Sequence, residues 1–205
     1  QDFAVTEHTS VSEADFRETV KHFARKFNLL AVCGGDSSLT IAAEELLAAG
    51  FRGELIFLPG GSVNDILLDI RGQKAAAKKT IYLGEISSPE DTKQFIGQAN
   101  WGLGVGVNRW EGYTLRVFPF LRPLQNFIGV LSIVMAHGLR RELVDGEIVA
   151  DIVSESGCWS IVIVSQIKYW ASGLQFCPDA SFHRPEFEIL TVKRCGLIRL
   201  IKIIL

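Results

Sequence analysis

The sequence lacks the features that would carry a protein into or across a membrane. Its longest apolar stretch, 127–139, falls short of the roughly 18 residues needed to span a bilayer, and it already contains a histidine. The N-terminus is polar, so no secretory signal is expected there. We therefore expect a cytoplasmic protein whose membrane contact, if it makes any, is peripheral.

Paired cysteines and clustered positive charge are also missing. The four cysteines, at positions 33, 158, 177 and 195, show no CxxC spacing, so we expect reduced, buried thiols in place of a disulfide frame or a zinc site. The formal net charge is −2, from 21 Lys and Arg against 23 Asp and Glu. Without a basic face, nucleic-acid binding has little electrostatic support.

The first 72 residues alternate between segments typical of helices and of strands. Ser10 followed by Glu13 fits a capping box at the start of the first helix. The expected elements are helices at 11–27, at 39–49 and from 65, and strands at 28–33 and 54–59. This alternation predicts a parallel, Rossmann-like α/β layer.

The pattern changes after about residue 72. Short segments rich in Ile, Val, Phe, Trp and Tyr follow, at 80–86, 94–104, 147–153, 158–168 and 187–193. They predict an antiparallel β-sandwich, interrupted by a helical insert at about 120–140. The sequence thus predicts two domains, an α/β nucleotide-binding domain at 1–72 and a β-sandwich domain at 73–205.

Two glycine loops follow the first two predicted strands. Residues 34–38 read Gly-Gly-Asp-Ser-Ser, and 60–65 read Gly-Gly-Ser-Val-Asn-Asp. Glycines let backbone N–H groups approach an anion closely, and a helix that begins after such a loop adds its positive dipole end. Two loops of this kind predict a nucleoside triphosphate site.

The same loops resemble a known family, the diacylglycerol kinase catalytic superfamily of lipid kinases. Residues 34–38 (GGDSS) resemble its GGDGT loop, and residues 58–65 (LPGGSVND) resemble its LPxGTxND loop. Downstream, 95–108 and 172–189 are similar to its glycine-rich strand and to its later proline-containing stretch. The family's first strand, with an Asn-Pro loop, has no match here, so we expect a fragment or a chain that omits segments.

The resemblance implies a lipid kinase that uses ATP and Mg²⁺ on a lipid substrate. It implies that Asp36 is catalytic, either accepting the proton of the lipid hydroxyl or positioning Mg²⁺ indirectly. No residue is assigned as a direct metal ligand. The residues expected to contact ATP are Gly34, Gly35, Ser37, Ser38, Gly61, Ser62, Asn64 and Asp65.

Three positions depart from the family pattern. Ser37 and Val63 each stand where the family has a glycine. A positive φ at position 37 would strain Ser37, because it carries a Cβ. Arg184 stands where some members carry the carboxylate that acts as general base. Either Asp36 is the base, or His183 substitutes, or catalysis is lost.

The middle of the chain allows two interpretations. The spacing Gly102-x-Gly104-x-Gly106 could be mistaken for a dinucleotide fingerprint, but we expect a glycine-rich β segment with no helix after it. Aromatic residues gather around the predicted insert, at Trp101, Trp110, Tyr113, Phe118, Phe120 and Phe127. Core packing is the default expectation for most of them.

The alternative for this region is docking at an anionic membrane surface, because arginines flank the apolar stretch at positions 109, 116, 122, 140 and 141. For the whole chain, the favoured interpretation is that it is an ATP-dependent lipid kinase. The alternatives are an NAD-kinase-like enzyme, a catalytically weak nucleotide- or lipid-binding homologue, and an α/β fragment without activity.

Overall fold

The computed structural model describes residues 5–61, 64–71, 80–139, 143–150, 153–170, 173–181 and 183–204. The contacts divide the chain into two compact units, Gln1–Gly60 and Gly61–Leu205. They are called the first and the second unit. The sequence placed a domain boundary after residue 72, twelve residues downstream of this division, and segment 72–79 lies outside the described residues.

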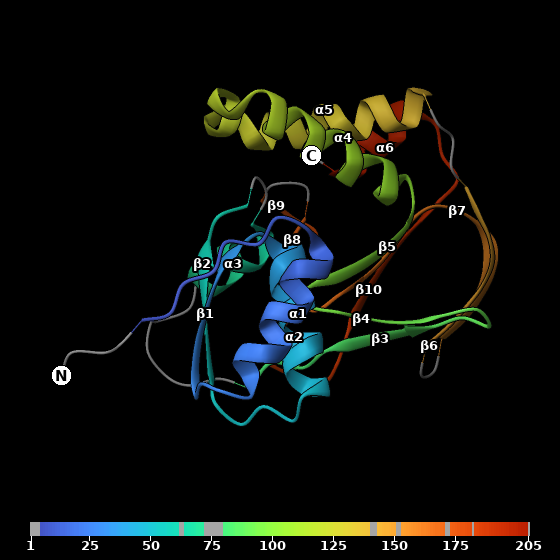
Figure 1. Cartoon of the computed structure of the whole chain (residues 1–205). Coiled ribbons are helices and arrows are strands. Elements are labelled where there is room, and N and C mark those ends of the chain that lie inside the picture. Colours follow the sequence, from blue (N-terminus) through green and yellow to red (C-terminus); the bar gives the residue numbers. More distant parts are fainter. Residues whose placement is uncertain are drawn as a thin grey trace. The chain divides into compact units, whose positions relative to one another are not determined.

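The first unit is a small α/β layer. Its elements are α1 (Glu13–Ala24), β1 (Leu29–Gly34), α2 (Asp36–Ala48) and β2 (Glu54–Pro59). The two strands pair in parallel, from Leu29 opposite Glu54 to Gly34 opposite Pro59. Both helices lie on one side of this sheet (Figure 1). Their apolar faces and the sheet enclose a core that contains Val20, Leu30, Val32, Ala42 and Leu46.

The first helix begins two residues later than the capping pattern predicted. Ser12 is its N-cap, and its hydroxyl accepts a hydrogen bond from the backbone N–H of Asp15 at 3.2 Å. Ser10 lies before this cap, so its assignment as a capping residue was wrong. Gly50 follows α2 with a φ of +65°, the left-handed conformation in which a glycine commonly ends a helix.

A charged network joins the two helices of the first unit. Arg17 on α1 donates from Nη1 to Glu44 at 2.9 Å and to Glu45 at 2.7 Å on α2, and from Nε to Glu13 at 2.9 Å. These carboxylates raise the pKa of Arg17 above its usual value, with Glu45 the largest contributor. Glu45 is buried, so the guanidinium compensates a carboxylate held out of water.

The second unit is built on an antiparallel sheet. Its strands are β5 (Gln98–Gly102), β6 (Val144–Ala150), β7 (Val153–Ser165) and β10 (Glu188–Lys193). Three of these strands, β5, β6 and β10, pair with the long strand β7. Two small hairpins accompany the sheet: β3 (Gly84–Ser87) with β4 (Thr92–Phe95), and β8 (Tyr169–Trp170) with β9 (Leu174–Gln175). The antiparallel character is as predicted, whereas the sandwich arrangement stays a prediction in its detail.

Helices occupy more of the second unit than the sequence indicated. They are α3 (Asp65–Arg71), α4 (Leu103–Val117), the 3₁₀ helix η1 (Pro119–Leu124), α5 (Gln125–Leu139) and α6 (Leu197–Ile204). Contacts join α4 to α5 and α5 to α6, and Figure 1 shows the three helices together. Their inner residues share a core with the sheet, which includes Leu103, Val107, Ile133, Ile161, Ile163 and Leu200.

The glycine-rich segment after β5 corrects one expectation. Gly102 has a φ of +72° and is the N-cap of α4, so a helix does begin there and contains Gly104 and Gly106. A Cβ at Gly104 would lie 2.8 Å from the Cβ of Asn100, so glycine is required for α4 to turn back against β5. The glycines therefore shape a strand-to-helix turn, and the expected β segment ends at Gly102.

No helix in the described part of the chain is long and apolar enough to cross a bilayer.

Candidate functional site

The first predicted glycine loop lies at the carboxyl end of the parallel strands. Because Gly34 pairs with Pro59, β1 and β2 end at the same edge of their sheet. The backbone N–H of Gly60 donates to the carbonyl of Gly34 at 2.8 Å, which joins the loop after β1 to the residue after β2. In open α/β layers this edge is where ligands bind.

The backbone at this edge is packed too closely for side chains. A Cβ at Gly34 would lie 2.4 Å from the hydroxyl oxygen of Ser38 and 2.5 Å from its Cβ. A Cβ at Gly60 would lie 3.0 Å from the Cys33 sulfur and 3.1 Å from the Gly34 nitrogen. Gly60 was not among the predicted contact residues, although its place directly after an apolar strand was the same signal that identified Gly34.

The helix α2 begins immediately after this loop. Gly35 is its N-cap, with an extended backbone and no side-chain hydrogen bond to the first turn. Helix N-termini carry N–H groups without intrahelical partners and a partial positive charge, which together attract phosphate. The sequence placed the start of this helix at 39, three residues too late.

The early start of α2 removes the strain expected at Ser37. Ser37 is the second residue of the helix, where φ is negative and a Cβ is tolerated. The replacement of a family glycine by Ser37 therefore costs no left-handed conformation here. Ser37 is exposed, and Ser38 is half-buried against Gly34.

Asp36 is the first residue of α2 and is half-buried. Its carbonyl accepts a hydrogen bond from the hydroxyl of Thr40 at 3.1 Å, one turn further on. A carboxylate in the first turn of a helix interacts favourably with the positive end of the helix dipole. It can accept a proton or attract a cation that accompanies phosphate.

The second predicted loop is described only in part, because Ser62 and Val63 lie outside the described residues. Asn64 directly precedes α3, and its carbonyl accepts a hydrogen bond from the backbone N–H of Leu68 at 3.1 Å. Its side-chain nitrogen donates to the carbonyl of Gly61 at 2.9 Å. Asp65 begins the helix and is buried. Its contact with a nucleotide stays a prediction.

The turn around His183 and Arg184 is held by local hydrogen bonds. The Arg184 guanidinium donates to the carbonyl of Asp179, and the backbone N–H of Arg184 donates to the carbonyl of Ser181 at 3.1 Å. His183 Nδ1 lies 2.9 Å from the carbonyl oxygen of Thr80. Arg184 thus closes the turn in which the resemblance implies a carboxylate.

Within the described ranges, no group of three or more His, Cys, Asp or Glu side chains could hold a metal ion.

Solved structures share the architecture of the chain. "A putative diacylglycerol kinase from Bacillus anthracis str. Sterne" superposes with a TM-score of 0.70 at 17% identity, over 95% of this chain and 66% of that chain. A second structure of a putative diacylglycerol kinase from this organism superposes with a TM-score of 0.69 at 17% identity, over 95% of this chain and 65% of that chain. A third structure, described as a diacylglycerol kinase from the same organism, superposes with a TM-score of 0.65 at 18% identity, over 96% of this chain and 64% of that chain.

The fold is that of the diacylglycerol kinases. The chain spans about two thirds of the length of these three structures. No protein-family model and no curated protein matches the sequence. At 17 to 18% identity the likeness establishes the fold and leaves substrate and activity to be proposed.

The kinase-like fold does not bury the aromatic residues around the helices, contrary to the default expectation. Phe120 and Phe127 are the most exposed, at 73% and 66%, and Trp101, Trp110, Tyr113 and Phe118 are exposed as well. Arg140 and Arg141 lie outside the described residues, and Arg109 is exposed. Core packing was therefore the wrong interpretation of these six residues.

The expectation of four buried thiols was also only partly right. All four cysteines are free, but Cys33 is exposed and only Cys177 is buried. Burial raises the pKa of Cys177 to about 11, with a smaller contribution from the charge of Glu188. The exposed Cys33 directly precedes Gly34, so its thiol lies beside the glycine loop.

Proposed function

We propose that the chain belongs to an ATP-dependent lipid kinase and that ATP phosphates bind at the loop between β1 and α2. The observation that supports this most is the start of α2 directly after Gly35, at the carboxyl end of a parallel strand. The N-terminus of a helix, with its backbone N–H groups and positive dipole end approached through glycines, favours the binding of an anion. The fold shared with the diacylglycerol kinase structures supports the proposal that this anion is a nucleotide phosphate.

Each part of the loop has a task in this proposal. Gly34 and Gly60 keep the edge of the sheet free of side chains, so that the phosphates approach the backbone. Gly35 exposes the N–H groups at the start of α2, and the hydroxyls of Ser37 and Ser38 donate to phosphate oxygens. Asn64 and Asp65 of the second loop are proposed as further nucleotide contacts on sequence grounds.

In the proposed reaction the hydroxyl oxygen of the lipid attacks the γ-phosphorus of ATP. The bond between the γ-phosphorus and the bridging oxygen breaks, and ADP leaves with that electron pair. The hydroxyl proton passes to the Asp36 carboxylate or to water. Such transition states are loose, so positioning and charge neutralisation supply most of the acceleration, and a base is needed late.

The residues present fit a nucleotide-bound magnesium ion better than a protein-bound one. Asp36 is the carboxylate nearest in sequence to the phosphate loop, and the described residues form no carboxylate cage. Mg²⁺ commonly keeps several waters and binds through substrate phosphates with one or two carboxylates. When bound, it would neutralise charge on the β- and γ-phosphates.

The lipid is proposed to be a diacylglycerol or a sphingoid, since the three similar structures are named as diacylglycerol kinases. Radiolabelled ATP with diacylglycerol, sphingosine, ceramide and NAD as acceptors tests the class. Transfer of label to a lipid supports the proposal. Label on NAD alone would support the NAD-kinase-like alternative, and no label on any acceptor would remove the kinase proposal.

Nucleotide binding is tested apart from catalysis. ATP with Mg²⁺ should raise the thermal midpoint of the chain, because a ligand that binds only the folded state stabilises it. Gly35→Val should abolish this shift by blocking the approach to the first turn of α2. Gly146→Val is the matched control, since nothing lies within 4 Å of a Cβ there. An unchanged shift in the Gly35 variant would reject the site.

Asp36→Asn separates the enzyme from a binding protein. We expect a loss of about 10²–10⁴-fold in lipid phosphorylation, the usual contribution of a general base, with ATP affinity within a few-fold of wild type. Equal turnover in the two proteins would overturn the role given to Asp36. A wild-type chain that binds ATP without phosphorylating any lipid would favour the binding homologue, for which Arg184 in the carboxylate position is the supporting observation.

A further inference from the structure

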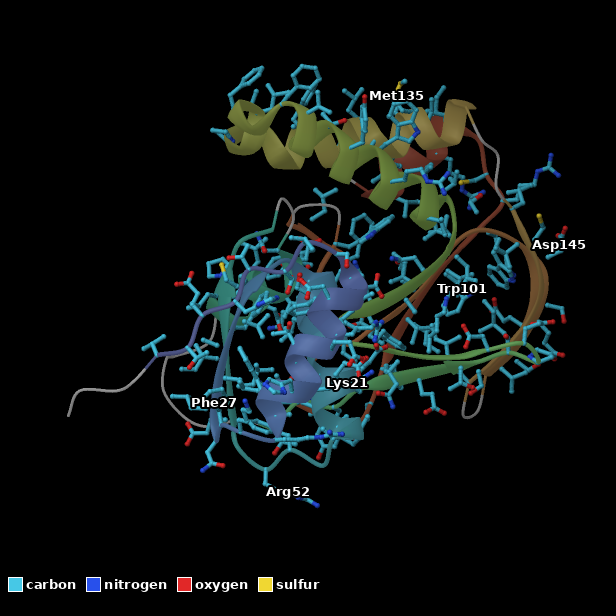
Figure 2. All side chains as sticks on the ribbon, viewed as in Figure 1. Lys21, Phe27, Arg52, Trp101, Met135 and Asp145 are labelled. Carbon is cyan, nitrogen blue, oxygen red and sulfur yellow. The ribbon has the colours of Figure 1, made fainter. Side chains whose placement is uncertain are left out.

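The exposed face of α5 is apolar. Phe127, Leu131 and Met135 recur every four residues and form one stripe, and all three are exposed. The residues between them that are described are buried or half-buried. Figure 2 shows Met135 on the side of α5 turned away from the sheet of the second unit. A surface helix ordinarily presents polar residues to water on this side.

The helix α4 and the turn after it extend the same surface. Tyr113 and Val117 are one turn apart on α4 and are exposed, and Phe120 of η1, which follows α4 in the sequence, is exposed as well. Contacts join α4 to α5, so Tyr113 and Val117 are exposed on a helix that packs against the helix carrying the stripe. The term helical face is used below for Tyr113, Val117, Phe120, Phe127, Leu131 and Met135.

The helices that carry this face are cationic. The ranges 103–139 and 197–204 contain five cations, Arg109, Arg116, Arg122, Arg199 and Lys202, and Glu111 is their only acidic residue. Arg109, Arg199 and Lys202 are exposed. The chain as a whole has a net charge of −2, so its negative charge lies outside these helices. Apolar and aromatic side chains beside cations match the interface of an anionic bilayer.

We propose that the helical face docks onto the surface of an anionic lipid bilayer. Aromatic and apolar residues of α4, η1 and α5 enter the boundary between headgroups and acyl chains, and the exposed cations Arg109, Arg199 and Lys202 contact the headgroups. This docking goes beyond the proposed kinase activity and does not depend on it. It does give a chain that acts on lipids a means of reaching them.

A bilayer fits the charge of this surface better than a second copy of the chain does. A symmetric dimer would bring the same patch of each copy together, and with it the exposed cations Arg109, Arg199 and Lys202 of both copies. Like charges brought into contact oppose association. A surface of anionic headgroups has the complementary sign.

Sedimentation with vesicles tests the proposal on the whole chain. Binding to vesicles of equal phosphatidylserine and phosphatidylcholine should exceed binding to pure phosphatidylcholine, and it should weaken as salt is raised, because exposed charges are screened. Phe120→Ser and Phe127→Ser should each lower binding by at least about fivefold, since a buried phenylalanine removes a large apolar area from water. Arg109→Glu should lower binding to the anionic vesicles alone.

Matched variants keep this test decisive. Val149→Ser changes a side chain of β6 that is 72% exposed, and Arg52→Glu reverses an exposed charge of the first unit. Both should bind as wild type does, and circular dichroism confirms that each variant is folded. The proposal is overturned if wild type ignores anionic vesicles at low salt, or if the controls lose as much binding as the helical-face variants. Self-association that Phe120→Ser abolishes, without vesicle binding, would make the face a contact between copies.

Discussion

Gly34 illustrates how one missing side chain shapes the glycine loop. Its backbone lies against Ser38, which α2 holds above the end of β1. Gly34→Ala should lower the free energy of unfolding by about 1–3 kcal/mol, the usual cost of forcing an extra carbon into a packed site. Urea unfolding measures the change. Gly146→Ala, whose new Cβ meets nothing within 4 Å, should stay close to wild type, and equal losses in both variants would refute the packing argument.

Arg17 is the residue on which the charged network of the first unit depends. Arg17→Met leaves the buried Glu45 without its shortest hydrogen bond and should lower the free energy of unfolding by about 1–3 kcal/mol. Lys21 lies 3.6 Å from Glu45 and is more exposed, so Lys21→Met should lower the free energy of unfolding less than Arg17→Met does. The prediction fails if the two variants unfold at the same denaturant concentration.

The two classes of cysteine should react at different pH. Iodoacetamide reacts with the thiolate, and burial raises the pKa of Cys177 to about 11, so this thiol stays protonated and protected. The stability that the protonated Cys177 contributes is complete below the ordinary thiol pKa of about 8.5 and is lost as pH rises through the raised value. Mass spectrometry at pH 8 should find Cys33 alkylated and Cys177 unmodified. Labelling of Cys177 first would contradict the burial.

At the scale of the element, the start of α1 gives a test between two serines. Ser12→Ala should lower stability by about 1 kcal/mol, because its hydroxyl accepts from a first-turn N–H that would otherwise lack a partner. Ser10→Ala should have no measurable effect, since Ser10 precedes the cap. Thermal unfolding of both variants decides which serine caps the helix.

Local chemistry explains which elements the sequence could predict. The strands of the first unit followed from apolar runs bounded by glycine, and β2 occupies Glu54–Pro59 as expected. The cap of α1 was misplaced because Ser10 and Ser12 satisfy similar patterns, and only the backbone geometry selects between them. The start of α2 was misplaced because Asp36, Ser37 and Ser38 are as typical of loops as of a first helical turn.

Tertiary contacts decided the elements that the sequence missed. Nothing local in the segment Leu103–Val117 distinguishes a glycine-containing helix from a glycine-rich strand, and its pairing with α5 resolves the choice. The candidate site was predictable to the extent that glycines follow apolar strands. The close approach of Gly60 to Gly34 was not, because it depends on the parallel register of β1 and β2.

At the scale of the molecule, the two units can be followed separately. All four tryptophans, at positions 101, 110, 159 and 170, lie in the second unit. Their fluorescence therefore reports that unit, while circular dichroism reports the helices of both. Arg17→Met, in the first unit, should lower the unfolding midpoint seen by circular dichroism more than the midpoint seen by fluorescence. Equal shifts would show that the whole chain unfolds in one cooperative step.

The parallel strands of the first unit have a practical consequence for handling the protein. Leu29, Ile56 and Leu58 are about half exposed on the face of the sheet away from α1 and α2. Within the described part of the chain, each of the two strands also has one unpaired edge. Flat apolar strands with open edges recruit strands from other molecules, so concentrated samples should aggregate through this sheet. Leu58→Lys would place a charge on that surface and raise the solubility limit of the protein, without changing the side of the sheet that packs against α1 and α2.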